Sequence, residues 1–307
     1  QGISHWIPTL ITGPSAKMER NCRVIAEALQ EKWIARSVPG IHLEGPYISP
    51  EDGPRGAHPK PHVRKPDLRE FDKLMKAADG KILYITVAPE AEGAIPFIKA
   101  VTKQGALAAL GHHNASAEII GQAVDAGARL STHLGNGLAS TIPRHANPLW
   151  PQLSEDRLYA SFIPDLEHLP PAVLKTLIRA KGPQRTILTS DVVYLAGLKP
   201  GRYTLQESEV ELLPSGRICL SGTEFLAGSS LLLLQGVVNA VQMTDLSLKE
   251  AYACVTSIPA KLFGVKHRFS LPEPGKRADF VVFDIRRTPP RWRAVIKAVF
   301  ILGDRVT

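Results

Sequence analysis

Cysteine is scarce in this sequence: only Cys22, Cys219 and Cys254 occur among its 307 residues. Their number is odd, they lie far apart, and no C-x-x-C pair is present. This pattern argues against a disulfide framework and against a cysteine-ligated zinc site. We therefore expect a reducing, cytoplasmic compartment.

Long apolar runs and several common catalytic motifs are also missing. No stretch approaches the roughly 20 apolar residues that a membrane-spanning helix needs, so no membrane partner is expected. The sequence contains no G-x-S-x-G nucleophile elbow, no Walker-type phosphate loop and no dinucleotide-binding glycine fingerprint. These absences argue against serine hydrolases of that type, nucleotide hydrolases and dinucleotide-dependent enzymes.

Basic residues outnumber acidic ones by 37 to 29, a formal net charge of +8. No aromatic-basic repeat or nucleic-acid-binding motif accompanies this excess, so nucleic acid is not an expected partner. A basic surface is compatible with a small phosphorylated ligand but does not establish one. With 44% hydrophobic and 21% charged residues, the composition is that of a globular protein with ample material for a core.

Seven short apolar or β-branched runs occur before residue 190, and most are separated by amphipathic helices. Regular alternation of this kind predicts a parallel sheet. A closed barrel needs eight strands. We therefore predict an α/β fold, a (β/α)8 TIM-type barrel that lacks its first strand. The predicted strands are Trp6–Thr12, Gly40–Glu44, Ile82–Ala88, Ala106–Gly111, Leu130–Leu134, Leu158–Ile163 and Thr186–Thr189.

The pattern changes after residue 191. Alternating segments within 202–220 predict a β-hairpin, helices are expected near 230–242 and 248–263, and strands near 278–283 and 294–302. These pieces predict a small β-rich second domain. The expected domains are 1–200 (barrel with the metal site), 201–222 (hairpin region of the small domain), 223–270 (barrel-associated helices) and 271–307 (C-terminal strands of the small domain).

Polar side chains stand where the predicted strands end. Such ends meet at the carboxyl face of a barrel, where active sites form. A Glu and two His residues suit zinc or another divalent transition metal, and an unligated Asp nearby is suited to proton transfer. Taken singly, a histidine after a strand is more often a hydrogen-bonded core residue, and an aspartate before a helix is usually an N-cap; the convergence of five such strand ends favours a metal site. The residues in question are Glu44, His112, His133, Asp165, His168 and Asp191.

The same residues lie in a series of motifs that resembles the N-acetylglucosamine-6-phosphate deacetylase family of the amidohydrolase superfamily. Each motif alone is weak, but their order and spacing are specific. They are Pro8–Thr12, His42–Pro46, Gly56–His58, Val63–Asp67, Val87–Glu90, Gly111–Ala115, Thr132–Leu134, Ser190–Asp191, Leu226–Ser230 and Gly275–Asp279.

The resemblance implies a role for each matching residue. Glu44, His112 and His133 are the implied ligands of a divalent metal, with zinc expected and Fe²⁺, Mn²⁺ or Co²⁺ as alternatives. Asp191 is the implied catalytic acid/base. The implied substrate contacts are Ala57, His58, Asn136, Gly137, Arg144, His168, Leu226, Ala227 and Gly228, with Arg144 as the phosphate partner. The implied reaction converts N-acetylglucosamine 6-phosphate to glucosamine 6-phosphate and acetate, and a homodimer is implied by analogy.

Several residues depart from the family pattern. Gly137 replaces the alanine of the family's Asn-Ala, Leu166 replaces the glycine of its Asp-Gly-x-His, and Val192 replaces the alanine after the catalytic aspartate. The segment Arg144–Trp150 is also unusual. These changes leave open an amidohydrolase acting on a different N-acyl amino sugar, and the missing first strand leaves open an inactive truncated fragment.

Overall fold

The computed structural model describes residues 2–265 and 274–306. The chain divides into two compact units. The first unit is His5–Ala160, and the second combines Gln1–Ser4 with Ser161–Thr307. The domain borders predicted from the sequence stay predictions, and the one at 270/271 lies outside the described residues.

Seven parallel strands form one sheet in the order of the chain, β1 to β7, which confirms the predicted α/β class. Each strand falls within its predicted run. No eighth parallel strand occurs among the residues that the structure describes. The strands are β1 (Thr9–Ile11), β2 (Ile41–Glu44), β3 (Ile82–Val87), β4 (Leu107–Leu110), β5 (Leu130–Ser131), β6 (Tyr159–Phe162) and β7 (Thr186–Leu188).

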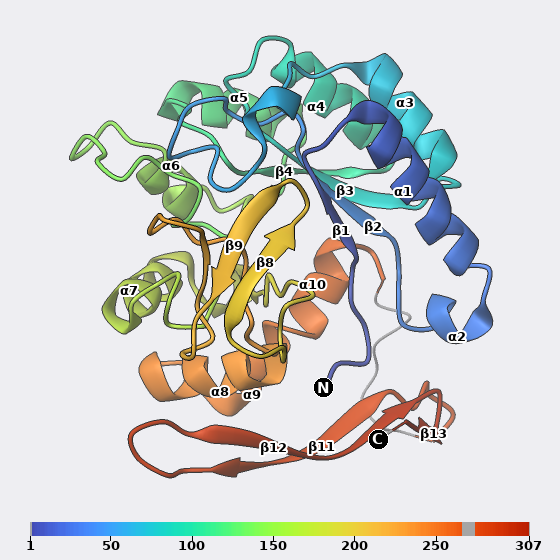
Figure 1. Cartoon of the computed structure of the whole chain (residues 1–307), viewed down its shortest axis with the longest axis vertical. Helices are drawn as coiled ribbons and strands as arrows, with labels where there is room; N and C mark the ends of the chain where they lie inside the picture. The colour runs from blue at the N-terminus through green and yellow to red at the C-terminus, as the bar shows by residue number, and fades with distance from the viewer. Residues whose placement is uncertain (1, 266–273, 307) are drawn as a thin grey trace. The chain divides into compact units, whose positions relative to one another are not determined.

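Helices cover the strands of the first unit, and α1, α3 and α4 lie along them in Figure 1. Residues Met18 and Cys22 recur at helical spacing on α1 and are buried. They belong to one apolar core with Ile41 and Leu43 of β2 and Ile85 of β3. The helices are α1 (Ser15–Ala28), α2 (Lys32–Ala35), α3 (Leu68–Ala77), α4 (Ala94–Lys103), α5 (Ala117–Ala126) and α6 (Leu149–Ser154), with a 3-10 turn η1 (Lys60–His62).

A hydrogen-bonded hub ties α3 to the loop after β2. The Arg64 guanidinium donates from Nε to Glu70 Oε2 at 2.9 Å and from Nη2 to Oε1 at 2.6 Å. The Tyr47 hydroxyl donates to the same carboxylate at 2.9 Å. Burial raises the pKa of the Glu70 carboxyl, but hydrogen bonding from Arg64 outweighs burial and leaves this pKa below its ordinary value.

The second unit contains four helices and two small antiparallel sheets among its described residues. Antiparallel strands were predicted here, but they form two sheets, ordered β10-β9-β8 and β11-β12-β13. The helices are α7 (Pro171–Lys181), α8 (Leu233–Met243), α9 (Leu248–Ala253) and α10 (Ser257–Leu262), with a 3-10 turn η2 (Pro183–Arg185). The strands are β8 (Gly201–Leu205), β9 (Ser208–Leu212), β10 (Ile218–Leu220), β11 (Phe280–Arg286), β12 (Arg293–Ile301) and β13 (Asp304–Arg305).

The single helix predicted over 248–263 is wrong, because the chain forms α9 and then α10. Pro259 is the third residue of α10. Proline lacks a backbone N–H and clashes with the preceding turn, so it is tolerated only in the first turn of a helix. A new helix therefore begins just before it. Among the described helices, none has the length and apolarity needed to cross a bilayer.

Candidate active site

Three buried ligand atoms converge in the first unit. Glu44 is the last residue of β2, and His112 and His133 follow the ends of β4 and β5. Both imidazole Nε2 atoms lie 2.9 Å from Glu44 Oε1 and 3.1 Å from each other. The structure thus brings the three residues predicted as metal ligands into one cluster. Their convergence follows from the parallel sheet, whose carboxyl ends share one edge.

The ring orientation of His112 fits a cation at this point. Its Nδ1 lies 2.9 Å from the Pro54 carbonyl oxygen, an acceptor, so Nδ1 carries the hydrogen. Nε2 is then the ring atom that a cation beside the Glu44 carboxylate would use. This tautomer, held by a backbone carbonyl, is the usual arrangement of a metal-binding histidine. Electron-rich atoms at such short separations are stabilised by a shared cation.

The spacing and charge of the cluster also suit a metal. Ligands 2.0–2.1 Å from a tetrahedral ion stand about 3.3 Å apart, so small shifts of these three groups would seat one. Burial raises the pKa of the Glu44 carboxyl, but hydrogen bonds from His112 and His133 outweigh burial and hold this pKa well below its ordinary value. Glu44 is therefore an anion at neutral pH. The donor set supports a divalent metal and does not identify it.

His58, a predicted substrate contact, lies beside this cluster. The Thr12 hydroxyl donates to the Glu44 backbone carbonyl at 3.5 Å and stands 2.9 Å from His58 Nδ1. The ring Nδ1–H therefore donates to Thr12, and Nε2 faces Glu44 Oε1 at 3.9 Å. Burial lowers the pKa of His58 well below its ordinary value, with a further contribution from His112, so the ring is neutral near pH 7.

Gly137, another predicted contact, packs against His112. Its φ is +61°, and a Cβ at this position would stand 2.9 Å from His112 Nδ1. Both the backbone conformation and the space therefore favour glycine here. The neighbouring Asn136 side chain donates to the His133 carbonyl at 3.1 Å. These two predicted contacts thus adjoin the two histidines of the cluster.

His113 takes no part in the cluster, as expected for the histidine that does not match a ligand. Its Nδ1 accepts a hydrogen bond from the Ala115 backbone at 3.2 Å. Burial lowers the pKa of His113 to about 4. The ring is neutral at physiological pH and serves the loop after β4.

Arg144 and Ala57, the remaining predicted contacts of this unit, lie in loops. Arg144 is exposed, and Ala57 is half-buried next to His58. The two loops approach closely at Gly53, where a Cβ would stand 3.0 Å from the Ala139 Cα.

In the second unit, His168 pairs with an acidic partner. Its Nδ1 lies 2.6 Å from Asp165 Oδ2, and Asp165 Oδ1 accepts from the backbone N–H groups of Glu167 and His168. Burial raises the pKa of Asp165, but the bond from His168 outweighs burial and lowers this pKa below its ordinary value. Leu166, which stands where the family has glycine, adopts a left-handed φ of 67°. A branched side chain is strained there.

Asp191 follows β7 with a left-handed φ of 48°. Its carbonyl accepts from the Ser229 backbone at 2.8 Å, directly after the predicted turn Leu226–Gly228. A Cβ on Gly228 would stand 3.2 Å from the same carbonyl oxygen. The predicted acid/base and the predicted pocket wall are therefore neighbours within this unit.

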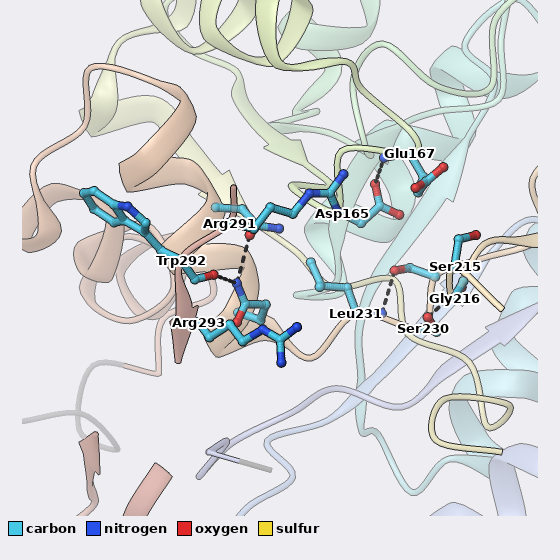
Figure 2. A pocket seen from close by; sticks show the side chains of 12 residues that line it. Asp165, Glu167, Ser215, Gly216, Ser230, Leu231, Arg291, Trp292 and Arg293 are labelled. Carbon is cyan, nitrogen blue, oxygen red and sulfur yellow. Dashed lines mark hydrogen bonds between the residues drawn. The ribbon is translucent and has the colours of Figure 1, made fainter. Parts of the chain in front are cut away.

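A cavity of about 270 Å³ opens beside Asp165 in the second unit. Its lining includes two basic residues, Arg291 and Arg293, and two acidic ones, Asp165 and Glu167 (Figure 2). The Gln235 side chain holds the backbone beside these arginines by donating to the Trp292 carbonyl at 2.9 Å and accepting from the Ala294 N–H at 3.0 Å. The opposed charges leave this cavity with no single preference for anions or cations.

Three supporting groups escaped the sequence-based prediction: the hydroxyl of Thr12, the carbonyl of Pro54 and the carboxylate of Asp165 as a partner of His168. Thr12 and Asp165 lie in or beside segments that the sequence singled out, so their position was a usable signal. Pro54 acts through its backbone, and no side-chain pattern marks such a group.

Comparison with known proteins agrees with these observations. The profile of the Amidohydrolase family matches residues 12–306. An N-acetylgalactosamine-6-phosphate deacetylase of Escherichia coli O157:H7 is 31% identical over 284 residues, which are 92% of this chain and 74% of that protein. The N-acetylglucosamine-6-phosphate deacetylase of Homo sapiens is 33% identical over 293 residues, covering 92% of this chain and 70% of the human protein.

Solved structures give the same result. The N-acetyl-D-glucosamine-6-phosphate deacetylase of Mycobacterium smegmatis superposes with a TM-score of 0.88 at 28% identity, covering 99% of this chain and 77% of that one. A mutant of that enzyme in complex with N-acetyl-D-glucosamine-6-phosphate gives a TM-score of 0.85 at 27% identity, with 99% and 76% covered.

Proposed function

Because this chain belongs to the amidohydrolase family, we propose that it hydrolyses N-acetylglucosamine 6-phosphate to glucosamine 6-phosphate and acetate. The observation that carries this proposal is the buried cluster of Glu44, His112 and His133, whose ligand atoms lie within 4.8 Å of one another. Several relatives in the same family are named for this activity.

In the proposed mechanism, Glu44, His112 and His133 hold one divalent metal. When bound, the ion supplies a Lewis acid for the acetamide carbonyl and lowers the pKa of water. Asp191 takes the proton of the attacking water and passes it to the nitrogen of the departing amine. This transfer is needed because an amide nitrogen leaves readily only as a neutral amine.

The other predicted contacts bind and orient the sugar in this proposal. Arg144 binds the phosphate with its planar guanidinium, which suits bidentate pairing. His58, neutral and buried beside the cluster, faces the acetamide group. The remaining contacts in this proposal are Ala57, Asn136, Gly137, His168, Leu226, Ala227 and Gly228.

A second candidate substrate is N-acetylgalactosamine 6-phosphate. The observation that favours it is the relative at 31% identity that is named for this sugar. The two sugars differ only in the configuration at one ring carbon, so the metal cluster treats them alike. Discrimination depends on the pocket walls, where Gly137, Leu166 and Val192 depart from the family pattern.

Zinc as the bound ion, a homodimeric assembly and a cytoplasmic location complete the proposal. A Glu and two His residues suit zinc at neutral pH, and the three free, buried cysteines suit a reducing compartment. Metal analysis of protein purified without added metal tests for zinc, and light scattering tests for the homodimer. Imaging of the tagged protein in its native cell tests the cytoplasmic location.

Acetate release from four sugars decides between the substrates. We expect the highest kcat/KM for N-acetylglucosamine 6-phosphate, followed by its galactose epimer, with both unphosphorylated sugars far behind. A higher value for the epimer would replace the proposed substrate. No release from any sugar by metal-loaded protein would contradict the proposed activity.

A further inference from the structure

The loop that carries Arg144 has no helix or strand to fix its conformation. It joins β5 to α6, and residues 134–148 contain bends and turns but no helix or strand. Arg144 is exposed, and no ion pair of its guanidinium is found among the described residues. The place of this side chain therefore depends on what fixes its backbone.

Asn147 is the first group that fixes it. Its carboxamide Nδ2 donates to the Pro143 carbonyl at 2.8 Å and lies 3.4 Å from the Arg144 carbonyl. Its Oδ1 accepts from the Leu149 backbone N–H at 3.0 Å, at the first residue of α6. One side chain, 5% exposed, thus joins the turn at Arg144 to the beginning of the helix.

Trp150 is the second residue that fixes the Arg144 backbone. Its indole Nε1–H donates to the Arg144 carbonyl at 3.0 Å, although the residue is 48% exposed. A half-exposed tryptophan on the first turn of a helix contributes little to a core. The Trp150 side chain therefore contributes mainly through its hydrogen bond to the Arg144 carbonyl.

We propose that Asn147 and Trp150 are positioning residues that hold Arg144 ready for the phosphate of the substrate. This inference rests on the proposed function, in which Arg144 binds that phosphate. Binding is weakened when a loop must be ordered at the moment of association, so a loop held beforehand favours affinity. Two donors on the Arg144 carbonyl restrict the backbone while leaving the guanidinium available to the ligand.

Two substitutions remove these bonds with little change in size. Asn147→Asp keeps the oxygen that accepts from Leu149 and places a second oxygen against two carbonyls. Trp150→Phe keeps an aromatic ring and removes the N–H. Because residue 150 is half-exposed, we expect this variant to fold. Trp33→Phe is the matched control, since Trp33 is 65% exposed and its indole donates to none of these groups.

We expect each variant to raise KM for N-acetylglucosamine 6-phosphate about fivefold, the value of one lost hydrogen bond, with kcat and metal content unchanged. The inhibition constant of inorganic phosphate should rise by the same factor. Kinetics on unphosphorylated N-acetylglucosamine, and all constants of Trp33→Phe, should stay at wild-type values.

A double-mutant cycle with Arg144→Ala separates positioning from a general structural role. If Asn147 and Trp150 act through Arg144, adding either substitution to Arg144→Ala has no further effect on KM or phosphate inhibition. A further loss in that background, or equal losses on both sugars, would overturn the inference. If Arg144→Ala itself leaves phosphate binding unchanged, the phosphate role in the proposed function fails and this inference fails with it.

Discussion

The predicted site residues of the two units differ in what holds them. In the first unit, Glu44, His112 and His133 touch one another, and a backbone carbonyl fixes the ring of His112. In the second unit, Asp191 is placed by backbone bonds to the turn that follows the small sheet. The first group indicates a metal by its own geometry, whereas Asp191 takes its role from the family resemblance. The following experiments test this difference.

Loss of a metal ligand should have the largest effect. Glu44→Gln removes the charge of the cluster and His112→Ala removes a ligand atom, so we expect metal content to fall from about one ion per chain to near zero. Activity should be lost in parallel. Elemental analysis measures the content, and His113→Asn serves as the control because its oxygen replaces Nδ1 without touching the cluster. Unchanged metal in both ligand variants would remove these residues from the site.

The substitution Asp191→Asn should separate chemistry from binding. It keeps the size of the side chain and removes its basicity, and proton transfer by such a group contributes about a hundred- to ten-thousandfold. We expect kcat to fall at least about a hundredfold while metal content and KM change little. Asparagine caps a turn as well as aspartate, so near-normal turnover would assign Asp191 to the backbone alone.

The Glu70 hub makes the stability of the first unit depend on pH. The folded pKa of Glu70 lies below its unfolded value of about 4.3, so its stabilisation is complete above that pH and is lost as pH falls through the folded pKa. Glu70→Gln removes the charge that pairs with Arg64, which still donates to the carbonyls of Gly13 and His62, and should cost about 2 kcal/mol at neutral pH. Urea unfolding between pH 7 and pH 3 measures both effects. A variant whose stability falls as steeply with acid as the wild type would show that another carboxyl dominates.

The smallest effect is expected at Gly137. Gly137→Ala adds a methyl group against the His112 ring in a strained backbone, and disturbing the support of a metal-binding histidine weakens metal affinity by about tenfold or more. Competition with a chelator measures this affinity. Gly121→Ala in α5, where a Cβ meets no atom within 4 Å, is the control and should bind metal normally. Equal affinities in both variants would mean that His112 tolerates displacement.

Much of the fold was predictable because it rests on local pattern. Alternation of apolar runs and helices located all seven strands, and polar residues at their ends located the metal cluster. What escaped prediction depends on particular contacts across the chain. The predicted helix over 248–263 is divided near Pro259, and its division depends on where this proline falls within a helical turn. Leu166 adopts a left-handed backbone conformation that a leucine does not favour.

The buried cysteines give each unit a natural reporter. Cys22 lies in the core of the first unit and Cys254 in the second, and burial raises the pKa of these thiols to about 11 and about 12. Protonated and covered thiols do not react with alkylating reagents until the surrounding structure opens. The alkylation rate of each cysteine therefore measures how often its own unit opens, without an engineered label. Bound metal should lower the alkylation rate of Cys22.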